Sequence, residues 1–191
     1  MTLAANVGHD EHVDDRGRVE QVLAGDRDAY RVLVERETAT VFAAAFRVLG
    51  RVAEAEDVTQ EAFVLAFRSL GSFRAEGTFG AWVRRIAVRQ ALRRLSQRRD
   101  AVPIDEGAVS LPAPGPDPLG LAIAEERSEQ VRRAVAALPE PYREVVALRF
   151  FADQSLAEIA EATERPLNTV KTHLHRGLTR LRDVLAREAA A

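Results

Sequence analysis

The sequence lacks cysteine, has few aromatic residues and contains no long hydrophobic run. The absence of cysteine excludes disulfides and thiolate metal sites. No apolar run approaches the ~20 residues of a membrane span, and residues 1–15 lack the cationic start and apolar core of a signal peptide. We therefore expect a cytoplasmic protein without membrane insertion. Aromatics make up only 6% of the residues, so we expect aliphatic, alanine-rich cores.

The net charge is small, −2, but the charged residues are unevenly distributed. Residues 84–99 hold seven arginines and no acid, and residues 165–182 hold five cations and no acid. Between them, residues 100–130 hold seven acids and one arginine. Basic blocks separated by an acidic one indicate two surfaces that face DNA on a nearly neutral chain.

Features of catalytic and metal sites are also missing. There is no glycine-rich phosphate loop, and His173 and His175 are two residues apart, which places them on different faces of a helix and not in a zinc pair. His9 and His12 can form a metal pair, but a disordered tail is the preferred interpretation. We predict no enzymatic activity, no catalytic residues, no metal and no cofactor.

Periodicity and punctuation predict an all-α protein of two small helical domains joined by a Pro-rich flexible linker. Residues 1–18 are predicted to be a disordered acidic tail, and residues 19–99 the first helical domain. Residues 100–120 form the linker, which holds five of the eight prolines. Residues 121–187 form the second domain, which ends in a helix-turn-helix.

The helix-turn-helix is predicted over residues 153–185. Ser155 and Glu158 form a capping box, and Pro166 ends the first helix before Asn168 or Thr169 caps the second. The apolar stripe of the second helix consists of Val170, Leu174, Leu178, Leu181 and Leu185. The opposite face carries cations and hydrogen-bonding groups, namely Thr169, Thr172, His173, Arg176, Thr179 and Arg180, with Lys171 and His175 on one flank. An amphipathic helix with a solvated basic face is the alternative interpretation. The capped preceding helix favours one that enters the major groove of DNA.

Three further segments of the first domain carry signals. An acidic helix over 53–70 buries Phe63 or Phe67, and its dipole explains its first acids but not Asp57, Gln60 and Glu61. A loop with two aromatics follows at 72–79, and Thr78 caps the next helix. In that helix Arg85, Arg89 and Arg93 share a face, which predicts an anionic partner, and Trp82 is interpreted as core rather than as a base-stacking platform.

Several segments, taken in order along the chain, closely resemble the extracytoplasmic-function sigma factors of bacterial RNA polymerase. They are EDVTQEAF, the aromatic loop, FGAWVRRIAVRQALRRL, the Pro-rich linker, LPEPYREVVALRFF, SLAEIAEA and NTVKTHLHRG. The resemblance covers residues 25–182. It implies a transcription initiation factor, often serving stress responses. Its expected partners are core RNA polymerase (clamp and flap), promoter DNA and an anti-sigma factor.

The resemblance also implies roles for residues at matching positions. Residues 19–99 correspond to region 2, which binds the clamp and opens the minus-10 element, and residues 121–187 to region 4, which reads the minus-35 element. The implied polymerase contacts are Asp57, Gln60 and Glu61. The implied minus-10 contacts are Ser72, Phe73, Arg74, Phe79, Arg85 and Arg89. The implied minus-35 contacts are Thr169, Lys171, Thr172, His173, His175, Arg176 and Arg180.

The chain departs from the family pattern in the turn. Glu164 stands where glycine is usual and is expected to carry a strained backbone, and Arg165 replaces an apolar residue. Asn168 replaces another glycine, and His173 replaces a frequent arginine. The competing hypothesis is a stand-alone helix-turn-helix regulator with a helical sensor domain. It explains the C-terminal half, but not the acidic helix or the arginine-rich helix.

Overall fold

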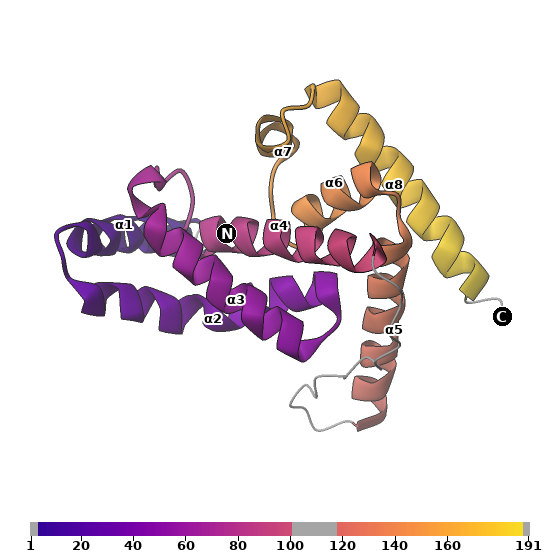
Figure 1. Ribbon diagram of the computed structural model, residues 1–191, viewed down its shortest axis with the longest axis horizontal. Helices are drawn as coiled ribbons and strands as arrows, with labels where there is room; N and C mark the ends of the chain where they lie inside the picture. The colour runs from indigo at the N-terminus through magenta and orange to yellow at the C-terminus, as the bar shows by residue number, and fades with distance from the viewer. Residues whose placement is uncertain (1–3, 101–117, 189–191) are drawn as a thin grey trace.

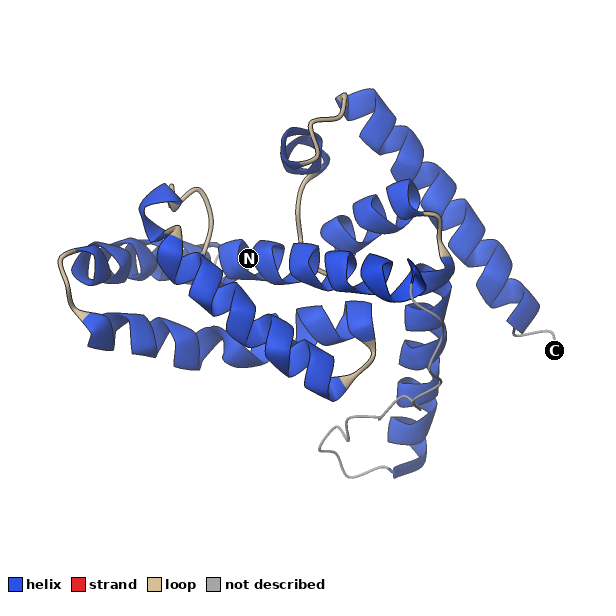
Figure 2. Ribbon diagram, viewed as in Figure 1, coloured by secondary structure: helices blue, strands red, loops and turns tan. Residues whose placement is uncertain are grey.

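We describe the protein from a computed structural model, which describes the backbone of residues 4–100 and 118–188 and the side chains of residues 14–98 and 126–188. Within these ranges every regular element is helical, which confirms the all-α prediction (Figures 1 and 2). None of the helices there is both long enough and apolar enough to cross a membrane.

The N-terminal half consists of four α-helices and a short 3-10 helix: α1 (Ala4–Leu23), α2 (Arg27–Leu49), α3 (Val52–Arg68), η1 (Leu70–Ser72) and α4 (Phe79–Asp100). Asp26, not Asp28, caps α2, because its carboxylate accepts from the backbone N–H groups of Asp28 (2.9 Å) and Ala29 (3.2 Å). Gly50 ends α2 with a left-handed φ of 70°. Helices α2, α3 and α4 pack on one another around a shared aliphatic core.

The N-terminal segment differs from the predicted disordered tail over residues 1–18. Helix α1 begins at Ala4, and Asp15 is completely buried. Val19 and Val22 join the hydrophobic core. The physical reason is that Asp15 finds its partners on α2 and α4, far away in the sequence, where local composition gives no signal. The side chains of His9 and His12 lie outside the described residues.

The C-terminal half comprises α5 (Pro118–Ala137), α6 (Glu140–Phe150), α7 (Leu156–Ala162) and α8 (Leu167–Glu188). Helix α8 packs against α5, α6 and α7, and a small core includes Val135, Val146 and Leu181. Residues 101–117, which form most of the predicted linker, lie outside the described residues, so the linker stays a prediction.

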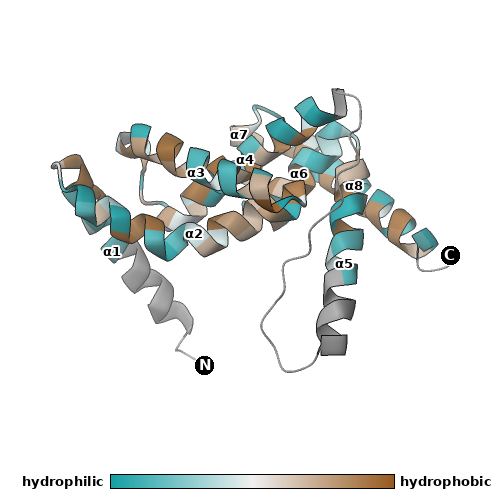
Figure 3. Cartoon of the chain, turned by 60° about the horizontal axis from the view of Figure 1, so that its bottom comes forward, coloured by the Kyte–Doolittle hydropathy of each residue, from teal (hydrophilic) through white to brown (hydrophobic). Residues whose placement is uncertain are grey.

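Helix α4 lies between the two halves and contacts both (Figure 1). It packs on α2 and α3 along one side and on α6 along another, and Val88, Leu92 and Leu95 are all buried. This two-sided packing explains why its apolar residues do not follow a single stripe. Hydrophobic and hydrophilic residues lie side by side on α2 and α3 (Figure 3).

Polar groups also join the halves. Arg143 of α6 is only 3% exposed and donates to the hydroxyl of Ser96 on α4 at 3.3 Å. The guanidinium of Arg132 on α5 lies 4.8 Å from the ring centre of Phe46 on α2. The two halves therefore pack closely against each other through α4, α5 and α6.

Candidate nucleic-acid interface

Helices α7 and α8 form the predicted helix-turn-helix. The Ser155 hydroxyl accepts from the backbone N–H of Glu158 at 3.2 Å, and the Glu158 carboxylate accepts from the backbone N–H of Ser155 at 2.7 Å. This confirms the capping box. Glu164 in the turn has a φ of +53°, the left-handed strain predicted at that position. The Arg165 side chain is held by Glu144 of α6 at 2.6 Å.

The start of α8 corrects one prediction. The helix begins at Leu167, so Asn168 and Thr169 lie inside its first turn and neither caps it. The carbonyl of Pro166 instead accepts from the backbone N–H groups of Thr169 (2.9 Å) and Val170 (3.1 Å). A proline immediately before the helix suits this arrangement, because its φ is already close to the helical value.

The buried face of α8 is close to the predicted stripe, with one correction. Val170 and Leu181 are buried, whereas Leu178 is 41% exposed. Gly177 takes the inward position in its place, and a Cβ there would lie 2.8 Å from Val146 Cγ2 of α6. The close approach of the two helices at this glycine turns the following leucine outward.

The outer face of α8 presents most of the predicted minus-35 residues to solvent. Lys171, Thr172, His175 and Arg176 are exposed in the first half of the helix, and we call these four residues the reading face. Across the part of the chain that the structure describes, neither cation of this set forms an ion pair. Unpaired cations on an exposed helix near its N-terminus are well placed to contact phosphates or base edges.

Three other predicted residues of α8 lie differently. Thr169 is half-buried, His173 packs edge-on to the Tyr142 ring at 5.4 Å, and the guanidinium of Arg180 covers that ring at 5.1 Å. Burial lowers the pKa of His173, and the nearby Arg165 and Arg176 lower it further. His173 is therefore favoured as a neutral imidazole at the α6–α8 contact.

The loop between η1 and α4 exposes some of the implied minus-10 residues and buries another. Ser72 and Arg74 are exposed and Phe73 is half-buried, but Phe79 is completely buried. The Phe73 ring lies 5.4 Å from that of Trp82 and 6.1 Å from that of Phe79. Phe79 therefore forms the floor beneath the loop and not a surface for an incoming base. Trp82 is half-buried against both rings, in agreement with its interpretation as core.

The arginines of α4 line a cleft shared by this loop and α7. Arg85 pairs with Glu158 of α7, and Arg84 pairs with Asp153 at 3.3 Å. Arg89 is exposed. For Arg85, one member of the predicted arginine row, the C-terminal half thus supplies an anionic partner within this structure. We call this the closed arrangement.

The acidic residues of α3 gather on an exposed face. Asp57 and Glu61 are 65% and 52% exposed, and both pair with Arg94 of α4, at 3.2 and 3.0 Å. Gln60 lies beside them in a shallow groove. Phe63 is the buried aromatic of this helix, whereas Phe67 is 46% exposed. The surface combines acids with apolar groups and suits a protein partner.

Comparison with known proteins agrees with this arrangement. The family models described as "Sigma-70 region 2" and "Sigma-70, region 4" match residues 33–101 and 128–181. The chain is 33% identical to the ECF RNA polymerase sigma factor SigW of Bacillus subtilis over 88% of its own length and 95% of that protein. The chain belongs to the extracytoplasmic-function (ECF) RNA polymerase sigma factors.

Other sigma factors support this assignment. The ECF sigma factor is 33% identical to the ECF RNA polymerase sigma-E factor of Escherichia coli K12, across 87% of this chain and 91% of that protein. Its fold is similar to that of CnrH in complex with the cytosolic domain of CnrY. This match has a TM-score of 0.62 and 22% identity, and it covers 91% of this chain and 98% of the other. The protein is therefore an alternative sigma factor that directs transcription initiation.

Sequence reasoning missed several residues of this sigma factor. Arg94, which joins two of the acids, and Arg84, which binds Asp153, were read only as part of a basic block. Asp15, which touches the first residue of α4, was assigned to the tail. The i, i+4 row of arginines indicated an anionic partner, but no local pattern indicated that the partner lies in the same chain.

Proposed function

We propose that this sigma factor reads promoters through two surfaces and holds core polymerase through a third. The reading face of α8 contacts the minus-35 element. The observation that supports this is that Lys171, Thr172, His175 and Arg176 are exposed at the start of the second helix of a helix-turn-helix, and that the two cations among them form no ion pair with any described residue. Arg176 suits bidentate contact with a guanine. The half-buried Thr169 and His173 contact DNA at the edge of this surface, and Arg180 contacts the sugar-phosphate backbone of the DNA.

The minus-10 surface is proposed to consist of the exposed loop and the adjoining face of α4. Ser72, Phe73 and Arg74 would capture an unstacked base, and the exposed Arg89 would bind the phosphates beside it together with Arg85 once Arg85 leaves Glu158. Phe79 supports this surface from below, since it is buried. Unstacking a base costs a few kcal/mol, and binding of the unstacked base by the loop would offset this cost and so favour strand opening.

The closed arrangement sets a condition on this function. Glu158 occupies Arg85, one of the two α4 arginines proposed to bind promoter phosphates, and Asp153 occupies the neighbouring Arg84. We therefore propose that the C-terminal domain moves away from α4 when the factor joins polymerase and promoter. The sigma factor RpoE of Bartonella quintana, whose structure is a complex with the anti-sigma factor NepR, has a similar fold (TM-score 0.58, 21% identity). An anti-sigma partner that favours the closed arrangement is part of the proposal.

The polymerase contact is proposed to be the α3 face with Asp57, Gln60 and Glu61, directed at the clamp, while residues 121–187 dock on the flap. The exposed Val64 and Phe67 beside these acids favour a protein partner over solvent. The protein would act in the cytoplasm, with the polymerase, and would catalyse no covalent step itself.

The deciding experiment is run-off transcription with purified core polymerase on a library of genomic fragments, with and without this protein. We expect new transcripts that share two upstream elements. If the protein binds duplex DNA tightly by itself, binds no polymerase and yields no transcripts, the proposal fails and a stand-alone regulator takes its place.

A further inference from the structure

The N-terminus of α4 is capped twice, once locally and once from a distance. The Thr78 hydroxyl accepts from the backbone N–H of Ala81 at 3.2 Å, which is the ordinary local cap. The backbone N–H of Phe79, the first residue of the helix, donates to the carboxylate of Asp15 on α1 at 2.6 Å. Asp15 is completely buried, although it is ionisable.

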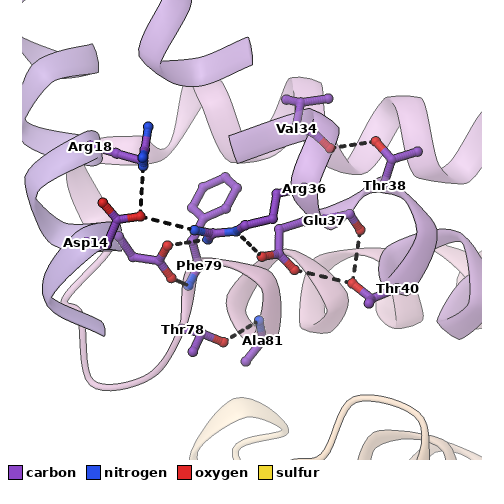
Figure 4. A network of polar contacts seen from close by, with 11 residues as sticks. Asp14, Arg18, Val34, Arg36, Glu37, Thr38, Thr40, Thr78, Phe79 and Ala81 are labelled. Carbon is purple, nitrogen blue, oxygen red and sulfur yellow. Dashed lines mark hydrogen bonds and ion pairs between the residues drawn. The ribbon is translucent and has the colours of Figure 1, made fainter. Parts of the chain in front are cut away.

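A buried carboxylate requires a partner, and Arg36 of α2 supplies one. Its guanidinium donates to Asp15 and also to Glu37 at 2.7 Å, with a longer contact of 3.5 Å to Asp14 (Figure 4). Burial opposes the charge on Arg36, but the hydrogen bonds and charges of Asp15 and Glu37 outweigh it and raise the pKa of Arg36. The cluster therefore contains a permanent cation between two acids.

Glu37 also lies against the first turn of α4. A Cβ added at Gly80 would lie 2.0 Å from the nearest oxygen of the Glu37 carboxylate, so alanine there would require this carboxylate to move away from α4. Two carboxylates from two different helices thus meet the positive end of the α4 dipole. We call Asp15, Arg36 and Glu37 the α4 anchor.

The α4 anchor holds one end of the loop proposed to bind the minus-10 element, which we call the minus-10 loop. The loop over residues 73–78 runs from η1 to α4, and Ala75 within it has a φ of +53°. Helix α1 contacts η1 at one end of the loop and, through Asp15, the first residue of α4 at the other. The ring of Phe73 rests on Phe79 and Trp82, so a shift of Phe79 would move the loop with it.

We infer that Asp15, at the centre of the α4 anchor, is a positioning residue that sets the geometry of the minus-10 loop through the backbone of Phe79. The inference rests on the proposed role of this loop in capturing single-stranded promoter DNA. It gives helix α1 a function in promoter opening through the buried side chain of Asp15. The minus-35 surface on α8 is independent of this contact.

The test compares Asp15→Asn with Asp14→Asn. The two substitutions remove the same charge from neighbouring positions of α1, but Asp14 is exposed and makes no contact with α4 in the described structure. Trp82 is the only tryptophan of the chain and touches both Phe73 and Phe79, so its fluorescence in the free protein reports on the loop. We expect Asp15→Asn to red-shift the emission and to increase quenching by acrylamide, and Asp14→Asn to change neither.

The second measurement uses holoenzyme assembled with each variant. One probe is a single-stranded oligonucleotide that carries the minus-10 sequence of a mapped promoter, and the other is a duplex with only its minus-35 element. Asp15→Asn should weaken single-strand binding roughly tenfold, the effect of replacing one buried charge-assisted hydrogen bond with a weaker neutral one. Binding of the duplex and of core polymerase should stay within twofold of wild type.

The inference is overturned if Asp15→Asn matches Asp14→Asn in both measurements, or if it weakens both probes and polymerase binding by the same factor, as a general loss of stability would. If Asp15→Asn does not fold, Gly80→Ala decides, because it displaces Glu37 from α4 and leaves Asp15 intact. Gly80→Ala should weaken single-strand binding alone, and an unchanged affinity would refute the α4 anchor. If wild-type holoenzyme ignores the minus-10 probe, the proposed role of the loop fails, while Trp82 still tests whether Asp15 holds it.

Discussion

The ion pair between Glu158 of α7 and Arg85 of α4 allows the closed arrangement to be weakened by one substitution. Glutamine at position 158 keeps the hydrogen bond to the backbone of Ser155, since glutamine also serves in a capping box, but it removes the charge. The side chains of Arg85 and Glu158 are 29% and 37% exposed, so the ion pair stabilises the closed arrangement by about 0.5–1 kcal/mol. Glu158→Gln should therefore lower the ratio of closed to open molecules about two- to fivefold.

The assay exploits the absence of cysteine. Cysteines introduced at the exposed Ala39 of α2 and Ala186 of α8 accept a fluorophore pair, and energy transfer between them reports the fraction of closed molecules. Glu161→Gln is the matched control, because Glu161 lies on the same helix and lines the same cleft but forms no ion pair with the described residues. Equal transfer in the two variants, or a larger closed fraction in Glu158→Gln, would refute the reasoning.

The same pair predicts a pH dependence. Burial raises the pKa of Glu158, but hydrogen bonds from Ser155 and the charge of Arg85 outweigh it, and the net pKa lies below its ordinary value of 4.5. Only the effect of Arg85 is linked to closure, because the hydrogen bonds with Ser155 lie within α7 and persist in the open state. That effect stabilises the closed state fully above the pKa of the open state and is lost as the pH drops through the lower pKa of the closed state. The closed fraction should thus be constant near neutral pH and fall only in acid, and Glu158→Gln should lack that step.

Three further predictions concern the other surfaces. Gly177→Ala gains about 1 kcal/mol of helix propensity but loses about 1–3 kcal/mol to overpacking against α6. In denaturant unfolding it should therefore be less stable than Gly17→Ala, whose Cβ meets nothing within 4 Å. Equal stabilities of the two variants would contradict the close α6–α8 contact. Arg176→Ala should cost about 1–3 kcal/mol at one promoter position and relax the preference there; equal weakening across a promoter panel would make Arg176 a phosphate contact. Asp57→Ala combined with Glu61→Ala should weaken binding to core polymerase in a pull-down titration, and unchanged affinity would remove α3 from the interface.

The sequence alone was enough for the helical class and for most helix ends. Asp26, Gly50, Thr78 and the Ser155 capping box act within one turn of the chain, so a local pattern contains all the information they need. The strain at Glu164 was also visible, because a non-glycine residue in a glycine position of the turn has few alternatives. The order of the motifs likewise pointed to the sigma factor family.

Only the tertiary structure decided which of these residues meet. Asp15 and Phe79 are 64 positions apart, and Arg85 and Glu158 are 73 apart. Such pairs depend on how whole helices dock, and periodicity within one helix says nothing about the charges on another. The same limit explains Leu178, which the contact at Gly177 turns outward. Local hydrogen bonds and periodicity determined the elements, whereas the packing of α4 between two halves determined which surfaces are free to bind.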